Sequence, residues 1–285
     1  GSDLIVEMLW VLEVYRGMLG GAVIVFLLLF MATIAPFLPL HDPLDQDLER
    51  RLSTPNCEYP LGTDNLGRCI CSRLVYGSRF SLPFGMAVAG TSLIIGAVIG
   101  AFSGYLGGRT DDALMRIADV LLAFPGLILA LAFIAVLGPG PVNASVALVA
   151  AGWAGYARMV RASTLAIKDR EFVEEVRALG ASDFYIITRH IVPNVVAPVL
   201  PMALLGAGYS ILALAGLSFL GLGVRPPTPE WGLMLSDGRL FMRSAPHLMI
   251  FPGLALSITI LAFNLLGDGL KDALQPKNTG VTDEI

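Results

Sequence analysis

EFVEEVRALGASDFYIITRHIVPN, residues 171–194, is a charged segment that lies between two apolar segments of the chain. With its flanks it carries six basic side chains, which are Arg158, Arg161, Lys168, Arg170, Arg177 and Arg189. Lys and Arg accumulate in the cytoplasmic loops of membrane proteins and set the orientation of the neighbouring spans. We therefore predict that a loop covering 164–194 lies on the cytoplasmic side of a membrane.

A short amphipathic helix is predicted at the start of this loop. Its apolar side chains recur at helical spacing and are Phe172, Val173, Val176 and Leu179. Its polar side chains are Glu171, Glu174, Glu175 and Arg177. Gly180 ends the helix, Ala181 follows, and Ser182 or Asp183 is expected to cap the next helix. The helix suits docking into another protein, whereas a solvated connector or a helix in the headgroup layer fits the periodicity equally well.

The composition is that of an integral membrane protein. Of 285 residues, 55% are hydrophobic and 15% are charged, and the mean hydropathy is +0.72. Soluble domains average about 25% charged residues, and a helix needs about 20 apolar residues to cross the hydrocarbon core. We predict an all-α protein with about six transmembrane helices, at Gly17–Leu40, Phe80–Gly104, Ile117–Leu137, Val142–Tyr156 (extended towards Ser163), Val195–Leu222 and Leu248–Leu266.

An even number of spans places both termini on the side of the charged loop. The predicted organisation is a cytoplasmic arm at 1–16, a first transmembrane helix at 17–40 and an external loop at 41–79. A five-helix core at 80–276 contains the loop at 164–194, and a cytoplasmic tail covers 277–285. Gly96, Gly100 and Gly104 form consecutive G-x-x-x-G steps, which are expected to let a neighbouring helix approach closely.

The three cysteines, Cys57, Cys69 and Cys71, all lie in the predicted external loop. The outer side of most bacterial membranes is oxidising, so a disulfide from Cys57 to Cys69 or Cys71 is the favoured arrangement. Three free thiols and a metal site with His41 or His247 are the alternatives. We expect no metal, because structural zinc sites usually need four ligands.

No catalytic group is apparent in the sequence. It lacks the G-x-x-x-x-G-K-[ST], H-E-x-x-H and G-x-S-x-G patterns, and its three histidines are far apart. No basic patch with interleaved aromatic residues indicates nucleic-acid binding. A secondary transporter or channel remains an alternative, although its usual midplane ionisable residue is missing. A membrane enzyme is a further alternative, which the scattered histidines disfavour.

The spacing of Glu174, Gly180, His190 and Pro193 resembles that of the EAA loop of ABC-importer permeases, and three further segments support the same resemblance. The segments are LGTDNLGRCICSRLVYGSRFSL at 61–82, GLSFLGLGVRPPTPEWGLML at 216–235 and FNLLGDGLKDAL at 263–274. The chain resembles the C-type permease subunits of dipeptide, oligopeptide, glutathione and nickel ABC importers over residues 17–276. It departs from their pattern at Cys69, where the family has Asp, and at Glu175 and Val176, where the family has Ala.

The resemblance implies a MetI-like, type I importer fold in a bacterial or archaeal inner membrane. The chain would be a non-enzymatic permease subunit for short peptides, or alternatively for nickel or a metal chelate. Implied partners are a B-type permease subunit, two ATPase subunits that bind ATP and Mg, a substrate-binding protein and membrane lipid. The ATPase-coupling residues implied by the EAA-like loop are Glu171, Phe172, Val173, Glu174, Val176, Arg177, Leu179, Gly180, Ala181, Ser182 and Asp183. Substrate-binding residues are not identified.

Overall fold

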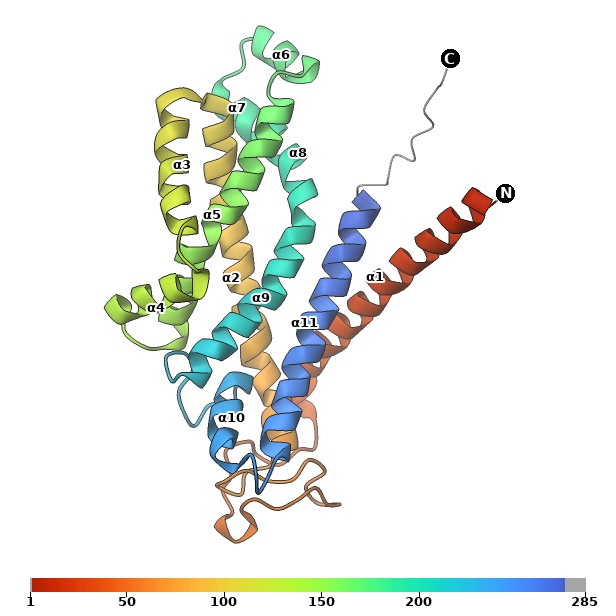
Figure 1. Cartoon of the computed structure of the whole chain (residues 1–285), viewed down its shortest axis with the longest axis vertical. Helices are drawn as coiled ribbons and strands as arrows, with labels where there is room; N and C mark the ends of the chain where they lie inside the picture. Colours follow the sequence, from red (N-terminus) through yellow and green to blue (C-terminus); the bar gives the residue numbers. More distant parts are fainter. Residues whose placement is uncertain (1, 275–285) are drawn as a thin grey trace.

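The structure is a computed structural model that describes the backbone of residues 2–274 and the side chains of residues 15–274, so the predicted tail at 277–285 lies outside it. Helices are the regular structure of this described part (Figure 1). They are α1 (Ser2–Ile34), α2 (Ile70–Leu106), α3 (Gly108–Leu122), α4 (Gly126–Leu137), α5 (Pro141–Ile167), α6 (Glu171–Ala178), α7 (Asp183–Ile186), α8 (Val192–Val196), α9 (Leu200–Phe219), α10 (Trp231–Gly238) and α11 (His247–Leu274). A π-helix at Ile187–Ile191 joins α7 to α8.

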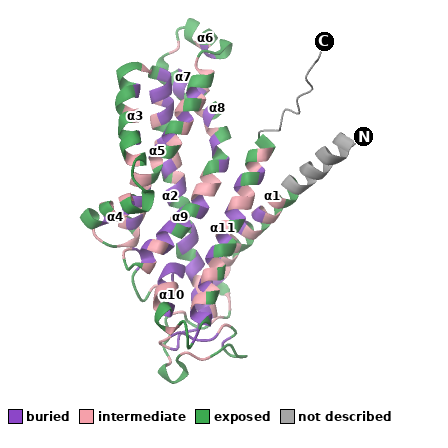
Figure 2. Ribbon diagram, viewed as in Figure 1, coloured by how far each residue is buried: buried purple, intermediate pink, exposed green. Residues whose placement is uncertain are grey.

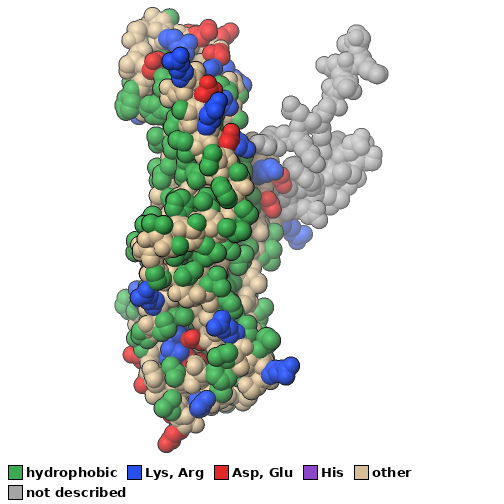
Figure 3. Space-filling model, turned by 60° about the vertical axis from the view of Figure 1, so that its left-hand side comes forward, with side chains coloured by type: hydrophobic (Ala, Val, Ile, Leu, Met, Phe, Trp, Pro, Cys, Tyr) green, Lys and Arg blue, Asp and Glu red, His purple; other side chains and the backbone are tan. Residues whose placement is uncertain are grey.

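Four described helical segments are long and apolar enough to cross a membrane, and the bent pair α3–α4 makes a possible fifth. The four are Tyr15–Phe37, Ile70–Leu106, Asp183–Phe219 and His247–Leu274. The 27 residues of α5 span about 40 Å, which is also long enough to cross, although α5 is not among the four. The predicted six spans are reached only by counting both α5 and the bent pair. Figure 3 shows a largely uncharged band between two ends that carry charged side chains.

Two predicted boundaries differ from the structure. The predicted arm at 1–16 is not a separate segment, because α1 runs from Ser2 to Ile34 without a break. The predicted external loop at 41–79 ends ten residues early, because α2 begins at Ile70. The first turns of α2 bury Ile70 and Arg73, and Gly77 lies against the indole of Trp231. This packing extends the helix beyond the apolar stretch that hydropathy detects.

The predicted single span Ile117–Leu137 is broken into α3 and α4, which meet at an angle of 96°. Pro125 lies at the break, immediately before the first residue of α4. Proline has no N–H to donate and disfavours helical conformation in the residue before it, so α3 ends at Leu122. In Figure 1, α4 consequently lies across the long axis of the molecule.

The glycines of α2 form its close contact with α5. An added Cβ at Gly96 would lie 2.5 Å from Tyr156 Cβ, and one at Gly100 would lie 2.4 Å from the carbonyl oxygen of Ala157. At Gly104 the nearest atom would be Thr164 Cβ, at 2.9 Å. The structure therefore places all three glycines against one neighbouring helix. Figure 2 shows buried residues concentrated along α2.

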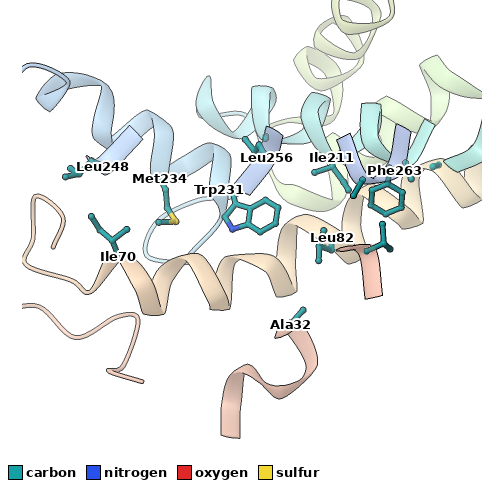
Figure 4. Close-up of a cluster of buried hydrophobic side chains, with 14 of the residues drawn as sticks. Ala32, Ile70, Leu82, Ile211, Trp231, Met234, Leu248, Leu256 and Phe263 are labelled. Carbon is teal, nitrogen blue, oxygen red and sulfur yellow. The ribbon is translucent and has the colours of Figure 1, made fainter. Parts of the chain in front are cut away.

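A hydrophobic core lies where α2, α9, α10 and α11 meet, as Figure 4 shows. Its largest side chain is Trp231, which is buried and donates from Nε1 to the carbonyl of Leu74 at 2.9 Å. Glu230 precedes it and is also buried. Its carboxylate accepts hydrogen bonds from the N–H groups of Gly232 and Leu233 at 3.0 and 2.8 Å, and so caps α10.

The Glu230→Gln variant is expected to have a flatter pH dependence of stability than the wild-type protein. Burial raises the pKa of Glu230 above its ordinary value of 4.5, against the effect of its hydrogen bonds. The contribution of Glu230 to stability is therefore fully present below about pH 4.5 and is lost as pH rises through the folded-state pKa, because the buried carboxyl must then ionise. Unfolding temperatures of the purified protein between pH 5 and pH 8 measure this. Parallel curves for the two proteins would contradict the prediction.

Candidate functional site

The charged loop forms one tip of the molecule, with α6 at its extremity (Figure 1). Glu171 and Glu174 lie in the first turn of α6 and Arg177 lies in its last turn. This distribution matches the helix dipole, which favours acidic groups at the N-terminus and basic groups at the C-terminus. The predicted short helix at this position is thus present over Glu171–Ala178.

The predicted apolar face of α6 is divided between the protein interior and the surface. Val173 is fully buried, and Val176 packs against the same cluster, which includes Ile186 and Ile187. Phe172 and Leu179 are 37% and 87% exposed. The four apolar positions predicted on α6 therefore do not form one exposed face, because the chain folds back after α6 and covers Val173 fully and Val176 in part.

Two aromatic side chains of α7 add to the exposed apolar surface at this tip. Phe184 is 66% exposed and Tyr185 is 50% exposed. We call the exposed set Phe172, Leu179, Phe184 and Tyr185 the tip surface. Charged side chains of both signs surround this end in Figure 3. An apolar surface rimmed by polar groups is typical of a protein–protein contact.

Gly180 makes the turn that separates α6 from α7. Its φ of +84° is in the left-handed region, and its N–H donates to the carbonyl of Arg177 at 3.0 Å. The N–H of Ala181 donates to the carbonyl of Val176 at 3.3 Å, which completes a Schellman motif. Ser182 then caps α7 by accepting from the N–H of Tyr185 at 3.4 Å. Of the two predicted caps, the structure uses Ser182.

Tyr105, at the end of α2, connects the two helices of the tip. Its hydroxyl donates to Asp183 Oδ1 at 3.2 Å and accepts from Arg177 Nη2 at 3.3 Å. The guanidinium of Arg177 also lies over the Tyr105 ring, 5.5 Å from its centroid. These contacts raise the pKa of Arg177 above its ordinary value. Sequence patterns did not reveal Tyr105, because its partners are more than 70 residues away.

Three helices are tied together beneath the tip by charged side chains. Asp111 of α3 accepts from Arg161 of α5, with Nε at 2.6 Å and Nη2 at 2.5 Å, and from Ser103 of α2. Arg158 of α5 pairs with Asp119 of α3. Arg158 and Arg161 were predicted only as orientation signals, whereas the structure uses both to join α5 to α3.

Tyr105→Phe is expected to weaken the connection between α6 and α2 without unfolding the protein. The variant keeps the ring beneath Arg177 and loses both hydrogen bonds, each of which involves a charged group and contributes about 1.5–3 kcal/mol when buried. Since both hydrogen bonds are only partly buried, we expect a small fall in unfolding temperature and faster amide hydrogen exchange in α6. Unchanged exchange in α6 would show that the hydroxyl does not hold this helix.

At the opposite end, a largely buried network joins Asp64, Arg68, Arg73 and Asp237. Arg68 Nε lies 2.6 Å from Asp64 Oδ2, and Arg68 Nη2 lies 3.3 Å from Asp237 Oδ2. Arg73 Nε lies 3.5 Å from Asp64 Oδ2, but its buried Nη2 has no hydrogen-bond partner among the described residues. Burial raises the pKa of Asp237.

The predicted disulfide does not form in the structure. Cys57, Cys69 and Cys71 are all free. Cys57 is exposed on the loop, while Cys69 is buried in a backbone bridge with Thr63 at the start of α2, so the two occupy different environments. Within the described residues, no group of three or more His, Cys, Asp or Glu side chains is arranged to hold a metal ion.

Comparison with known proteins agrees with the motif-based resemblance. The family described as "Binding-protein-dependent transport system inner membrane component" matches residues 96–280. The chain is 41% identical over 257 residues to the dipeptide transport system permease protein of Alkalihalophilus pseudofirmus, covering 90% of this chain and 84% of that protein. It is 44% identical over 259 residues to the glutathione transport system permease protein of Pectobacterium atrosepticum, covering 90% and 86%.

A solved structure of the MetNI methionine ABC transporter in an inward-facing conformation has the same fold. Its matching chain gives a TM-score of 0.56 at 18% sequence identity, covering 71% of this chain and 96% of that chain. The predicted MetI-like architecture is therefore confirmed. The chain belongs to the family of binding-protein-dependent transport system inner membrane components.

Proposed function

We propose that this chain is a permease subunit of an ATP-driven, binding-protein-dependent importer of short peptides or related small solutes. The main support for this proposal is the tip surface. It presents apolar side chains beyond the uncharged band (Figure 3), next to the turn that Gly180 makes. Relatives that transport dipeptides and glutathione support the solute class. Nickel or a metal chelate is the second candidate, and no observation favours a secondary transporter.

The proposed partners follow from the two ends of the molecule. Two ATPase subunits, which bind ATP and Mg, would contact the tip surfaces of this chain and of a homologous B-type permease subunit. A substrate-binding protein would contact the opposite end, where α10 and the loop at 38–69 lie. In Figure 1, α1 begins and α11 ends on the side of the tip, which supports a cytoplasmic location for both termini.

The contacts beneath the tip supply a mechanical route. Movement of α6 would act on Tyr105 through Arg177, and on α7 through the same hydroxyl. The Asp111–Arg161 pair and the glycine contacts join α2, α3 and α5, so these helices would move together. Alternating access then requires no chemistry on this chain, because ATP hydrolysis takes place on the partner subunits.

Leu179→Asp tests the proposed docking surface. Leu179 is 87% exposed, so a charge there should leave the fold intact and disrupt an apolar contact with a partner. Leu240→Asp is the matched control, because Leu240 is 80% exposed in the 3-10 turn Arg239–Phe241 after α10. We expect Leu179→Asp to lose at least about tenfold in ATPase-subunit recovery from mild-detergent membranes, since one buried Leu contributes about 1.5–3 kcal/mol.

Recovery of the ATPase subunits is measured by mass spectrometry, together with ATP-dependent peptide uptake into cells. Retention of the ATPase subunits by Leu179→Asp would contradict docking at the tip. Loss of the subunits in both variants would indicate a general effect of surface charge on the assembly, and the tip would have no special role.

A further inference from the structure

A groove lies between the middle of α5 and the first half of α9. Its volume is about 310 Å³, and Gly152, Gly155 and Gly206 leave it open while Tyr156, Tyr209 and Met202 line it. Tyr209 lies nine residues from the start of α9, or about 14 Å along the axis, and ten residues from its end. In a hydrocarbon core of about 30 Å, the Tyr209 end of the groove is therefore near mid-depth.

Tyr209 makes the groove unlike a lipid-facing surface. Tyr156 contacts the carbonyl of Met202 through its hydroxyl, at 3.4 Å. Tyr209 is 57% exposed, and its hydroxyl lies 3.8 Å from the position of an added Cβ at Gly126, the first residue of α4. Tyrosine is enriched at membrane interfaces, and a hydroxyl without a partner in hydrocarbon is costly. The exposed phenol of Tyr209 at mid-depth thus indicates a polar occupant.

A further polar group lies behind the groove. Ser92 of α2 is 2% exposed, and its Oγ has no hydrogen-bond partner among the described residues. That oxygen lies 3.3 Å from the position of an added Cβ at Gly152. The absence of a side chain at Gly152 therefore leaves Ser92 Oγ close to the groove. The lining contains no Asp, Glu, Lys, Arg or His.

We propose that this groove is the chain's part of the solute pathway and that it contacts the amide groups of a small peptide. Phenol hydroxyls donate to carbonyls and accept from N–H groups, and the lack of ionisable side chains favours a solute whose own charges balance. The glycines admit the backbone of the solute, and Met202 adds an adaptable apolar contact. This inference rests on the importer function proposed above.

Filling the groove tests the assignment directly. An added Cβ at Gly155 meets no described atom within 4 Å, so Gly155→Leu should fold normally and occupy the open space. Gly20→Leu on α1 is the matched control, because an added Cβ there also meets nothing within 4 Å. In proteoliposomes containing the complete importer, we expect Gly155→Leu to reduce uptake of radiolabelled dialanine and glutathione at least tenfold. Gly20→Leu should transport at the wild-type rate.

Water access provides a readout that needs no transported solute. Tyr209→Cys, with Cys57 and Cys71 replaced by serine, should react with a membrane-impermeant maleimide in the assembled complex. Leu261→Cys, at mid-depth on α11 and 56% exposed, should not react. Wild-type uptake by Gly155→Leu, or an unreactive Tyr209→Cys in a transporting complex, would overturn the assignment of the groove to the solute pathway. A wild-type chain that recovers no ATPase subunits would instead contradict the importer function.

Discussion

Gly100→Leu is expected to prevent stable packing of α2 against α5. An added Cβ at this position would lie 2.4 Å from the carbonyl oxygen of Ala157 and 2.9 Å from the backbone nitrogen of Arg161. Both atoms belong to the α5 backbone, so no rotamer change relieves the collision and the helices must separate. Overpacking of a core costs about 1–3 kcal/mol when side chains can adjust, and we expect a loss at or above that range.

Gly90→Leu supplies the control on the same helix. An added Cβ at Gly90 meets no described atom within 4 Å, so leucine there adds the same bulk without a collision. The measurements are the yield of monodisperse protein extracted from membranes and its unfolding temperature. Equal values for the two variants would show that close approach at Gly100 does not limit stability.

The close-packing role of the three α2 glycines could be predicted from the sequence. Three glycines four residues apart lie on one helical face whatever the tertiary structure, so their role in close packing followed from periodicity. The identity of the partner helix did not follow. The contacting residues Ala157, Arg161 and Thr164 of α5 lie about 60 positions away, and no local pattern links them to α2.

Hydropathy misjudged both the start of α2 and the continuity of the third span for a related reason. The predicted span started at Phe80 and left Arg73 in the external loop, but in the structure Asp64 lies beside its guanidinium and the helix continues through it. Pro125 was visible in the sequence, and a proline in a span permits either a mild kink or a complete break. Only the packing of α4 shows which of the two occurs.

The position of α6 was predicted accurately, but the division of its side chains between interior and surface was not. The 3.6-residue period identified four apolar positions on α6, but it does not tell which of them the chain itself covers. Burial of Val173 and Val176 depends on Ile186 and Ile187, which return to α6 only because of the turn at Gly180. The exposed apolar side chains of α7 therefore belong to the same surface.

Gly180→Val is expected to abolish most transport while leaving the membrane-embedded helices intact. The φ of +84° at Gly180 is in the left-handed region, which costs an L-residue about 1–2 kcal/mol and a β-branched residue more. An added Cβ meets no described atom within 4 Å, so the effect arises from backbone conformation and not from collision. The Schellman bonds would rearrange, and α6 would be displaced relative to Tyr105 and α7.

Gly180→Asn separates this conformational effect from the loss of glycine itself, because Asn adopts the left-handed region more readily than other side chains. In proteoliposomes of the complete importer, we expect Gly180→Val to lower dipeptide uptake at least tenfold while ATP hydrolysis continues. Gly180→Asn should stay within a few-fold of wild type, and both should keep the wild-type unfolding temperature within a few degrees. Equal uptake by the two variants would mean that the turn does not set the position of α6. Coupling to the ATPase subunits would then depend on the tip surface alone.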